Sequence, residues 1–212
     1  MQYLIIPLFL VLAYLLGSIP TSYIMGKKLK NIDIRNYGSG NVGATNALRV
    51  LGTKIGIITL IIDMGKGFLV VFLAKLLMQK FNFDNIDIAL IFIGLAAIIG
   101  HIFTIFLSFK GGKGVATSAG VFIALTPIAF SIAFLCFIII VWITKYVSLG
   151  SITAAVILSI TELIINIRNY FDKLEFLIFV FIIAIFVIVR HKDNIKRLLA
   201  GNENKLNFKK QS

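Results

Sequence analysis

Within the stretch 106–120, FLSFKGGKGVATSAG, the segment GGKG at 111–114 places Lys113 among three glycines between two apolar runs. Gly111, Gly112 and Gly114 permit close approach of the backbone to a ligand, and Lys113 adds a positive point charge. A helix that begins after these glycines would add the positive end of its dipole and its first N–H groups. These features suit the binding of phosphate or another small anion. An interfacial turn with membrane-flanking lysines is the alternative, and so short a pattern does not decide between the two.

A second polar stretch, 35–49, reads RNYGSGNVGATNALR and combines glycines with short hydrogen-bonding side chains. Glycines permit positive φ angles, so that successive N–H groups can form a concave anion site. Arg35 and Arg49 offer forked donors for bidentate contact to phosphate. A hydrophilic turn flanked by lipid-facing arginines is the alternative here. The residues that supply the loop's flexibility and hydrogen-bonding groups are Gly38, Ser39, Gly40, Asn41, Gly43, Thr45 and Asn46.

The chain contains two histidines, which lie close to polar stretches. His101 ends a helix-like run before the glycine loop, where packing and a role in a site are equally expected. His191 begins the sequence HKDN, so His191 and Asn194 share one face of a helix at a spacing of three residues. An ordinary basic helix attracted to anionic lipid headgroups is the alternative interpretation of this segment.

The elements that must position these residues are membrane spans. The composition is 59% hydrophobic and 14% charged, which is typical of an integral membrane protein. About 20 apolar residues cross a bilayer, and the first apolar run, without a basic leader or cleavage site, is expected to be a retained span. A sixth run at 115–143 is too long for one ordinary helix and contains Pro127. The five other runs are 3–24, 55–78, 86–109, 147–165 and 174–189.

The distribution of basic residues predicts how the spans are oriented. Segment 26–54 carries six lysines and arginines, and the segment from Arg190 onward carries seven, so both are expected in the cytoplasm. The N-terminus then lies outside and the number of crossings is odd, which requires the long run to be split at Pro127. We therefore expect an all-α polytopic membrane protein with seven transmembrane helices and a cytoplasmic C-terminus. The segment 115–126 is short for a full crossing and would need a thinned bilayer or a start within the glycine loop.

This topology gathers the polar chemistry on the cytoplasmic face. Four stretches are expected to meet there around one anion-binding pocket: 35–49, 109–114, 145–151 and 190–198. Asp63 and Lys66, three residues apart within a span, are expected to form a structural pair, because an unpaired charge in lipid is costly. The single cysteine, Cys136, and the lack of a dense carboxylate set predict no metal and no cofactor.

The polar stretches and their flanking segments resemble one known family, the bacterial acyl-phosphate:glycerol-3-phosphate acyltransferases called PlsY. The resemblance runs in order from residue 17 to residue 203. Its segments are GSIPTSYIMGK at 17–27, RNYGSGNVGATNALRVLG at 35–52, DMGKG at 63–67, GHIFTIFLSFKGGKGVAT at 100–117, KYVSLGSI at 145–152 and RHKDNIKRLLAGNE at 190–203. Two positions depart from the family pattern: Thr104 replaces a usual proline, and Asp193 replaces a usual glutamate.

The resemblance implies that an acyl group moves from acyl phosphate to the 1-hydroxyl of glycerol 3-phosphate, which gives lysophosphatidic acid and phosphate. It implies one acyltransferase domain at 1–203, followed by a polar cytoplasmic tail at 204–212, in the bacterial cytoplasmic membrane. Partners are then the two substrates and membrane lipids, with no nucleic acid and no obligate protein partner. Glu203 matches a glutamate regarded as structural. The catalytic candidates are Ser39, Arg49, Lys113, His191 and Asn194, and the substrate-binding candidates are Gly38, Gly40, Asn41, Thr45, Asn46, Gly111, Gly112, Gly114 and Ser148.

Acyl phosphate is an activated anhydride, so direct attack by the substrate hydroxyl is expected, with either His191 or a substrate phosphate as the proton acceptor. Ser39 as an acyl-accepting nucleophile ranks lower, because no base lies near it in the sequence. A transporter for phosphate-bearing anions is the main rival, but the predicted outer loops lack glycine–basic combinations. An acyl-CoA enzyme would carry a His-x4-Asp motif, which is absent from this sequence. A purely structural membrane protein would not need four polar motifs on one face.

Overall fold

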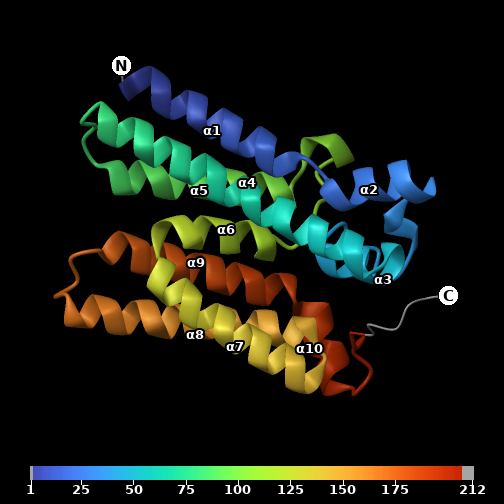
Figure 1. Cartoon of the computed structure of the whole chain (residues 1–212). Helices are drawn as coiled ribbons and strands as arrows, with labels where there is room; N and C mark the ends of the chain where they lie inside the picture. Colours follow the sequence, from blue (N-terminus) through green and yellow to red (C-terminus); the bar gives the residue numbers. More distant parts are fainter. Residues whose placement is uncertain (1, 207–212) are drawn as a thin grey trace. The chain divides into compact units, whose positions relative to one another are not determined.

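The computed structural model describes residues 2–206, and every regular element in that range is a helix, as the sequence predicts. The basic tail residues Lys209 and Lys210 lie outside the described residues. The chain forms two compact units, one that ends at Ala124 and one that begins at Leu125. Figure 1 labels the helices of both.

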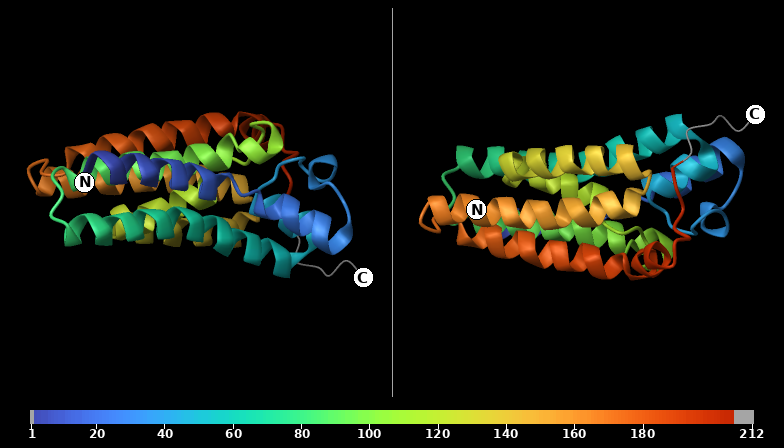
Figure 2. Two further views of the ribbon diagram at one scale, coloured as in Figure 1. Left: turned by 90° about the horizontal axis from the view of Figure 1, so that it is seen from above. Right: turned by 90° about the horizontal axis from the view of Figure 1, so that it is seen from below.

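The first unit contains five of the helices together with nearly all of α6. Helices α2 and α3 lie together around the first turns of α4 in all views (Figures 1 and 2). Helix α1 packs along α5. The bounds are α1 (Gln2–Ser18), α2 (Thr21–Lys30), α3 (Ala44–Leu51), α4 (Thr53–Lys80), α5 (Ile86–Ile102) and α6 (Val115–Leu125), with 3-10 turns η1 (Ile34–Asn36) and η2 (Ile105–Leu107).

Glycines bring the helices of the first unit into close contact. A side chain at Gly17 would lie 2.1 Å from the carbonyl oxygen of Ala97, and one at Gly100 would lie 2.2 Å from that of Tyr14. Helices α1 and α5 therefore approach backbone to backbone. This is how small residues stabilise helix pairs in lipid, where dispersion contacts replace the hydrophobic effect.

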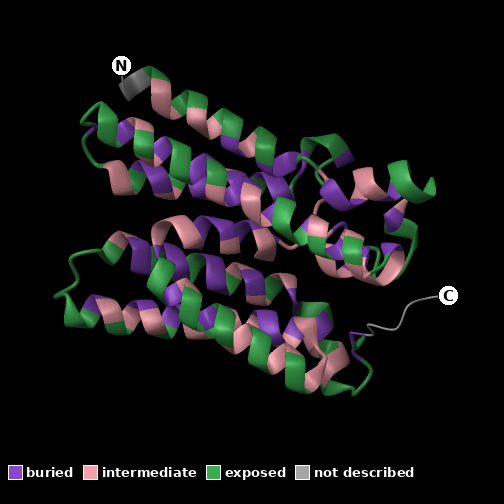
Figure 3. Ribbon diagram, in the orientation of Figure 1, coloured by how far each residue is buried: buried purple, intermediate pink, exposed green. Residues whose placement is uncertain are grey.

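The first predicted span, 3–24, consists of two helices rather than one. Helix α1 ends at Ser18 and α2 begins at Thr21, because Pro20 has no N–H group and restricts the residue before it. Together α1 and α2 contain one candidate span, Leu4–Lys30. Helix α1 exposes an apolar surface suited to lipid, which is green in Figure 3 and includes Leu4, Leu8, Val11 and Leu12.

The second unit consists of α7 (Pro127–Thr144), α8 (Val147–Arg168), α9 (Leu174–Arg190) and α10 (Lys192–Leu199). Helix α8 packs against both α7 and α9. Lys145, in the left-handed conformation, ends α7 and lets the chain turn into α8. Helices α9 and α10 meet at an angle of 57° at His191, so this histidine lies at a bend rather than within a helix.

The long apolar run 115–143 is split where the sequence predicts. Helix α6 ends at Leu125, and Pro127 is the first residue of α7, a position at which its missing N–H has no cost. Within residues 2–206, five segments are long and apolar enough to cross a membrane, with α1 and α2 counted as one, or six if α9 and α10 form one span. Helix α6, with 11 residues, rises about 16 Å, which is roughly half of the hydrocarbon core. Seven crossings therefore stay a prediction.

Candidate functional site

A tight turn exposes the backbone around Ser39. Gly38 and Gly40 have φ angles of +60° and +69°, which residues with a Cβ adopt at a cost in energy. The N–H of Gly40 donates to the carbonyl of Tyr37 over 3.1 Å. Ser39, between the two glycines, is exposed at the tip of this turn, so its hydroxyl can reach a substrate.

Asn46 holds the turn from inside. Its Oδ1 accepts the N–H of Ser39 at 2.9 Å, and its Nδ2 donates to the carbonyls of Tyr37 at 3.1 Å and Ile34 at 3.3 Å. The side chain is only 1% exposed. A side chain at Gly38 would lie 2.3 Å from Asn46 Oδ1. The sequence predicts Asn46 as a substrate-binding residue, whereas these contacts make it the internal support of the Ser39 turn.

Arg35 is occupied by a different partner from the one expected. Its guanidinium forms a forked ion pair with Asp33, at 2.7 Å between Nη2 and Oδ2, and lies over the ring of Tyr23. The hydrogen bond from Arg35 lowers the pKa of Asp33 to about 2. The interpretation of Arg35 as a phosphate clamp is therefore not supported, because its charge is already compensated. Arg49, half-buried on α3, keeps that assignment.

The glycine–lysine loop caps the end of α5. The N–H groups of Gly111 and Gly112 donate to the carbonyls of Ile102 and His101, at 2.9 and 3.0 Å. These two N–H groups satisfy carbonyls that a helix end leaves without partners. They are therefore bonded within the protein, although the sequence predicts that this backbone approaches a ligand. The donors that an anion would meet in this segment are the side chain of Lys113 and the first turn of α6.

His101 is placed by the same loop. It is buried, and a side chain at Gly112 would lie 2.1 Å from its Nε2. The glycine is therefore required by close packing on the imidazole ring, in addition to backbone flexibility. The sequence left His101 undecided between packing and a site role. Its contact with the loop makes it a residue that fixes the loop's position.

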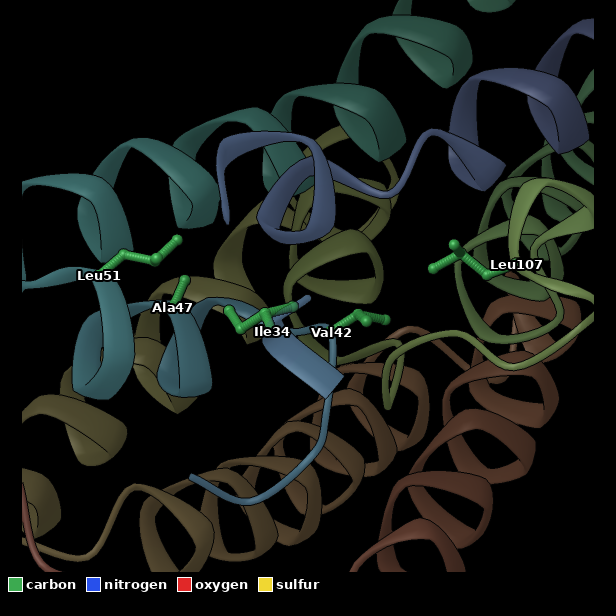
Figure 4. Packing of buried hydrophobic residues seen from close by; sticks show 5 residues of the cluster. All are labelled: Ile34, Val42, Ala47, Leu51 and Leu107. Carbon is green, nitrogen blue, oxygen red and sulfur yellow. The ribbon is translucent and has the colours of Figure 1, made fainter. Parts of the chain in front are cut away.

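The two stretches of the first unit share one hydrophobic cluster, shown in Figure 4. Val42 from the Ser39 loop and Leu107 from the segment before the glycines are both buried in it. The other members are Ile34, Ala47 and Leu51. This cluster packs the loop that carries Ser39 and the segment that precedes the glycines into one core.

In the second unit, the buried carboxylate of Glu203 gathers the predicted residues. Its Oε1 accepts from Ser148 Oγ at 2.9 Å and from Asn194 Nδ2 at 2.7 Å. Its Oε2 accepts from Arg197 Nε at 2.7 Å. Ser148 and Asn194, 46 positions apart in the numbering, are thus held on one oxygen atom. Glu203 is the centre of this group.

His191 is oriented by the helix that precedes it. Its Nδ1 lies 2.8 Å from the carbonyl oxygen of Val187, and the side chain is buried. A carbonyl only accepts, so Nδ1 carries the proton, and in the neutral ring Nε2 is then the proton-accepting atom. This tautomer is the one that a general base acting through Nε2 requires.

The buried carboxylate of Glu203 leads to a prediction about how the stability of the protein depends on pH. Burial alone would raise the pKa of Glu203, but hydrogen bonds from Asn194, Arg197 and Ser148 outweigh it and lower the pKa below the usual 4.5. Because the pKa is lower in the folded than in the unfolded protein, the charged carboxylate stabilises the fold fully above its unfolded-state pKa. This stabilisation is lost as the pH falls through the folded-state pKa. Glu203→Gln should therefore lower stability by roughly 2 kcal/mol at pH 7, and by much less near pH 3.

The measurement is thermal unfolding in detergent at both pH values, with Asp172→Asn as a control at an exposed acidic residue. Equal destabilisation by Glu203→Gln at both pH values would contradict the role given to the charged carboxylate.

The predicted site residues thus fall into two groups, one in each unit. Ser39, Asn41, Asn46, Arg49 and the glycine–lysine loop belong to the first, and Ser148, His191 and Asn194 to the second. The convergence of all four stretches in one pocket stays a prediction. Within residues 2–206, no group of three or more histidine, cysteine or acidic residues could hold a metal ion.

Comparison with known proteins decides the family. The family model described as "Glycerol-3-phosphate acyltransferase" matches residues 7–201, which includes the four polar stretches 35–49, 109–114, 145–151 and 190–198. The chain belongs to the glycerol-3-phosphate acyltransferase family. Glycerol-3-phosphate acyltransferases from Fusobacterium nucleatum and Macrococcus caseolyticus are 49% and 46% identical to it. The alignments cover 94% and 97% of this chain, and 97% and 99% of theirs.

Two solved structures of a family member share the fold. Both are of PlsY, described as an integral membrane glycerol 3-phosphate acyltransferase, in a lysophosphatidic acid form and a glycerol 3-phosphate form. Their TM-scores with this chain are 0.81 and 0.82, at 37% and 40% identity. The alignments cover 96% and 95% of this chain and 96% of each solved chain. The chain is therefore an integral membrane protein of the acyltransferase class used in phospholipid synthesis.

Proposed function

We propose that the protein transfers a fatty acyl group from acyl phosphate to the 1-hydroxyl of glycerol 3-phosphate, with lysophosphatidic acid and inorganic phosphate as products. The observation that carries this proposal is the family match at residues 7–201, because it spans all four polar stretches. The glycerol 3-phosphate form of a solved relative supports that acceptor. The acyl-phosphate donor rests on the sequence resemblance and on the absence of a His-x4-Asp motif from the sequence.

The proposed setting is the bacterial cytoplasmic membrane, with seven crossings, the N-terminus outside and the C-terminus in the cytoplasm. The basic residues of 26–54 and of the segment from Arg190 support this orientation. Helix α6 would be a short crossing in a locally thinned bilayer. Residues 1–203 would act as one acyltransferase domain with a polar tail at 204–212.

The proposed chemistry is direct transfer. The substrate hydroxyl oxygen attacks the acyl carbonyl carbon, a C–O ester bond forms, and the bond between that carbon and the phosphate oxygen breaks. The electron pair leaves with inorganic phosphate. The hydroxyl proton goes to Nε2 of His191 or to a substrate phosphate. Such a reaction needs positioning and charge compensation more than a covalent enzyme intermediate.

The residues take complementary roles in this reaction. Lys113 and Arg49 would hold phosphate groups and offset the charge that develops on the leaving group. His191 and Asn194 would orient glycerol 3-phosphate. Ser39, on its exposed turn, would contact a substrate as a hydrogen-bonding group, and Ser148 would do the same from the start of α8. The proposed substrate-binding groups are the backbone of Gly38, Gly40 and Gly114 and the side chains of Asn41 and Thr45. Gly111, Gly112 and Asn46 are bonded within the protein, so they would support the two loops instead of contacting a substrate.

Direct transfer predicts that no acyl-enzyme forms. Incubation with acyl phosphate alone, followed by mass spectrometry of the intact protein, should show an unchanged mass. A Ser39→Ala variant treated in the same way identifies any adduct at that residue. An acyl group on Ser39 in the unsubstituted protein would overturn direct transfer in favour of a serine nucleophile.

The experiment that tests the function uses purified protein, glycerol 3-phosphate and either acyl phosphate or acyl-CoA. Phosphate release and lysophosphatidic acid are both measured. Product with acyl phosphate alone is the expected result, and product with acyl-CoA alone would overturn the proposed donor. Flux of glycerol 3-phosphate into liposomes without any product would favour the transporter instead.

A further inference from the structure

The break between α1 and α2 is a centre of buried hydrogen bonds in the first unit. A helix end leaves carbonyl groups without partners, and Pro20 supplies no N–H. The carbonyl of Ser18 accepts from Thr104 Oγ1, and that of Ile19 accepts from Lys66 Nζ. Ser18 Oγ donates to the carbonyl of Gly100 at 3.2 Å. The break is therefore fixed to α4 and α5 by side chains.

An ion pair anchors the second side of the break. Asp63 Oδ1 lies 2.6 Å from Lys66 Nζ, and it accepts the Thr21 hydroxyl at 2.7 Å. Lys66 Nζ also donates to Thr21 Oγ1 at 2.6 Å. Asp63, Lys66 and Thr21 are 1%, 7% and 5% exposed. Buried charges hold a fixed geometry when they are paired and hydrogen-bonded to each other. The hydrogen bonds to Asp63 and Lys66 therefore fix the position of the Thr21 side chain.

The residue after Thr21 connects this anchor to the Ser39 loop. Ser22, fully buried, donates its hydroxyl to the carbonyl of Val42. A peptide group is planar and trans, so the next N–H, that of Gly43, points the opposite way. This N–H donates to Asn41 Oδ1 at 2.9 Å. A carboxamide whose oxygen faces an N–H presents its Nδ2 as a donor on the other side.

We propose that Ser22 and the Asp63–Lys66–Thr21 anchor are positioning residues that set the orientation of the Asn41 carboxamide, so that Nδ2 faces a phosphate-bearing substrate. The proposal rests on the proposed function, because Asn41 lies in the loop assigned to that substrate. The anchor lies in the first two spans, and its effect reaches the loop through a single peptide group. None of these four residues contacts a reacting atom in this assignment.

The kinetic test is a double-mutant cycle with Ser22→Ala and Asn41→Ala. Ser22→Ala should raise the KM for glycerol 3-phosphate about tenfold, the effect of one lost hydrogen bond, with kcat nearly unchanged. In the Asn41→Ala background the same change should alter KM by less than about twofold, because the group that it orients is gone. An equal factor in both backgrounds would overturn the proposal.

Thr59→Val is the matched control. Thr59 is fully buried on α4, and its hydroxyl donates to the carbonyl of Ile55 within the same helix. Thr59→Val should leave KM unchanged, and a KM effect as large as that of Ser22→Ala would show a general loss of packing. Thr21→Val removes the Thr21 hydroxyl and keeps the shape of the side chain, so it should also raise the KM for glycerol 3-phosphate. It replaces Ser22→Ala as the test of the positioning role if Ser22→Ala does not fold.

Hydrogen exchange without substrate separates this inference from the proposed function. The amide of Gly43 should exchange roughly tenfold faster in Ser22→Ala than in the unsubstituted protein, while amides of α4 stay protected. Unchanged exchange at Gly43 would overturn the positioning role even in an active enzyme. Faster exchange in a protein without acyltransferase activity would support the positioning role and reject the substrate assignment.

Discussion

Lys113→Ala is expected to lower kcat/KM roughly hundredfold or more, the usual effect of removing one charged donor from a phosphoryl or oxyanion site. Lys113 follows Gly111 and Gly112, whose N–H groups are bonded to the end of α5. The loop therefore presents its charge through this side chain and the start of α6. Because the backbone bonds of the loop do not involve the lysine side chain, the variant should insert and fold normally.

Lys110→Ala is the matched control, since this lysine is exposed in the same loop and has no role in the proposed site. It should change kcat/KM by less than about twofold. Lys113→Arg, which keeps the charge, should recover part of the loss. Normal kinetics in Lys113→Ala would show that the phosphate assignment of this loop is wrong.

Gly112→Ala tests the same loop by a different mechanism. The added methyl would lie 2.1 Å from Nε2 of His101 and 2.9 Å from its Cδ2, so the ring or the loop must move. A shift of about 1 Å in a positioning element can reduce activity a hundredfold. We expect a raised KM for the phosphate-bearing substrates, and a normal KM would refute the packing role of Gly112.

The largest effect on stability is expected from Asp63→Leu. The change leaves the ammonium of Lys66 buried without its carboxylate partner, 7% exposed in a membrane span. Breaking a buried pair by removing one partner costs about 3–5 kcal/mol. Lower yield of inserted protein and a lower unfolding temperature in detergent are the expected results.

The double variant Asp63→Leu, Lys66→Leu should recover much of this loss, because replacing a whole buried pair by apolar residues is often nearly neutral. Recovery should be incomplete, since Lys66 also donates to the carbonyl of Ile19. Lys80→Leu, at the exposed end of the same helix, controls for loss of charge. A double variant less stable than Asp63→Leu would contradict the pairing argument.

The positions of the helices could be predicted from the sequence because they depend on local signals. Apolar runs of sufficient length predicted α4, α5, α7, α8 and α9. Most of the predicted helix ends lie within a few residues of the observed ones. Pro127 predicted the break after α6 because proline suits the first turn of a helix and not its interior. The same rule applied to Pro20 would have predicted the break between α1 and α2, which the hydropathy of the run conceals.

The partners of the polar groups could be predicted only where they are close in the chain. Asp63 and Lys66 pair as expected, because a spacing of three residues places them on one face of a helix. Asn46, Arg35 and the N–H groups of Gly111 and Gly112 have partners that the sequence did not indicate. Each is bonded within the protein rather than directed at a ligand, because a buried polar group takes whichever partner the fold brings to it.

The sequence by itself determined the helical membrane class and the paired charges of α4, and it supplied the polar stretches to which the chemistry is assigned as a proposal. These follow from apolar length, from short spacings and from residue types, which are local properties. Only the tertiary structure decided that Glu203 holds Ser148 and Asn194, and that Ser22 from the first span sets the peptide beside Asn41. Such contacts join residues that no local pattern relates, because packing and hydrogen-bond geometry bring them together when the chain folds.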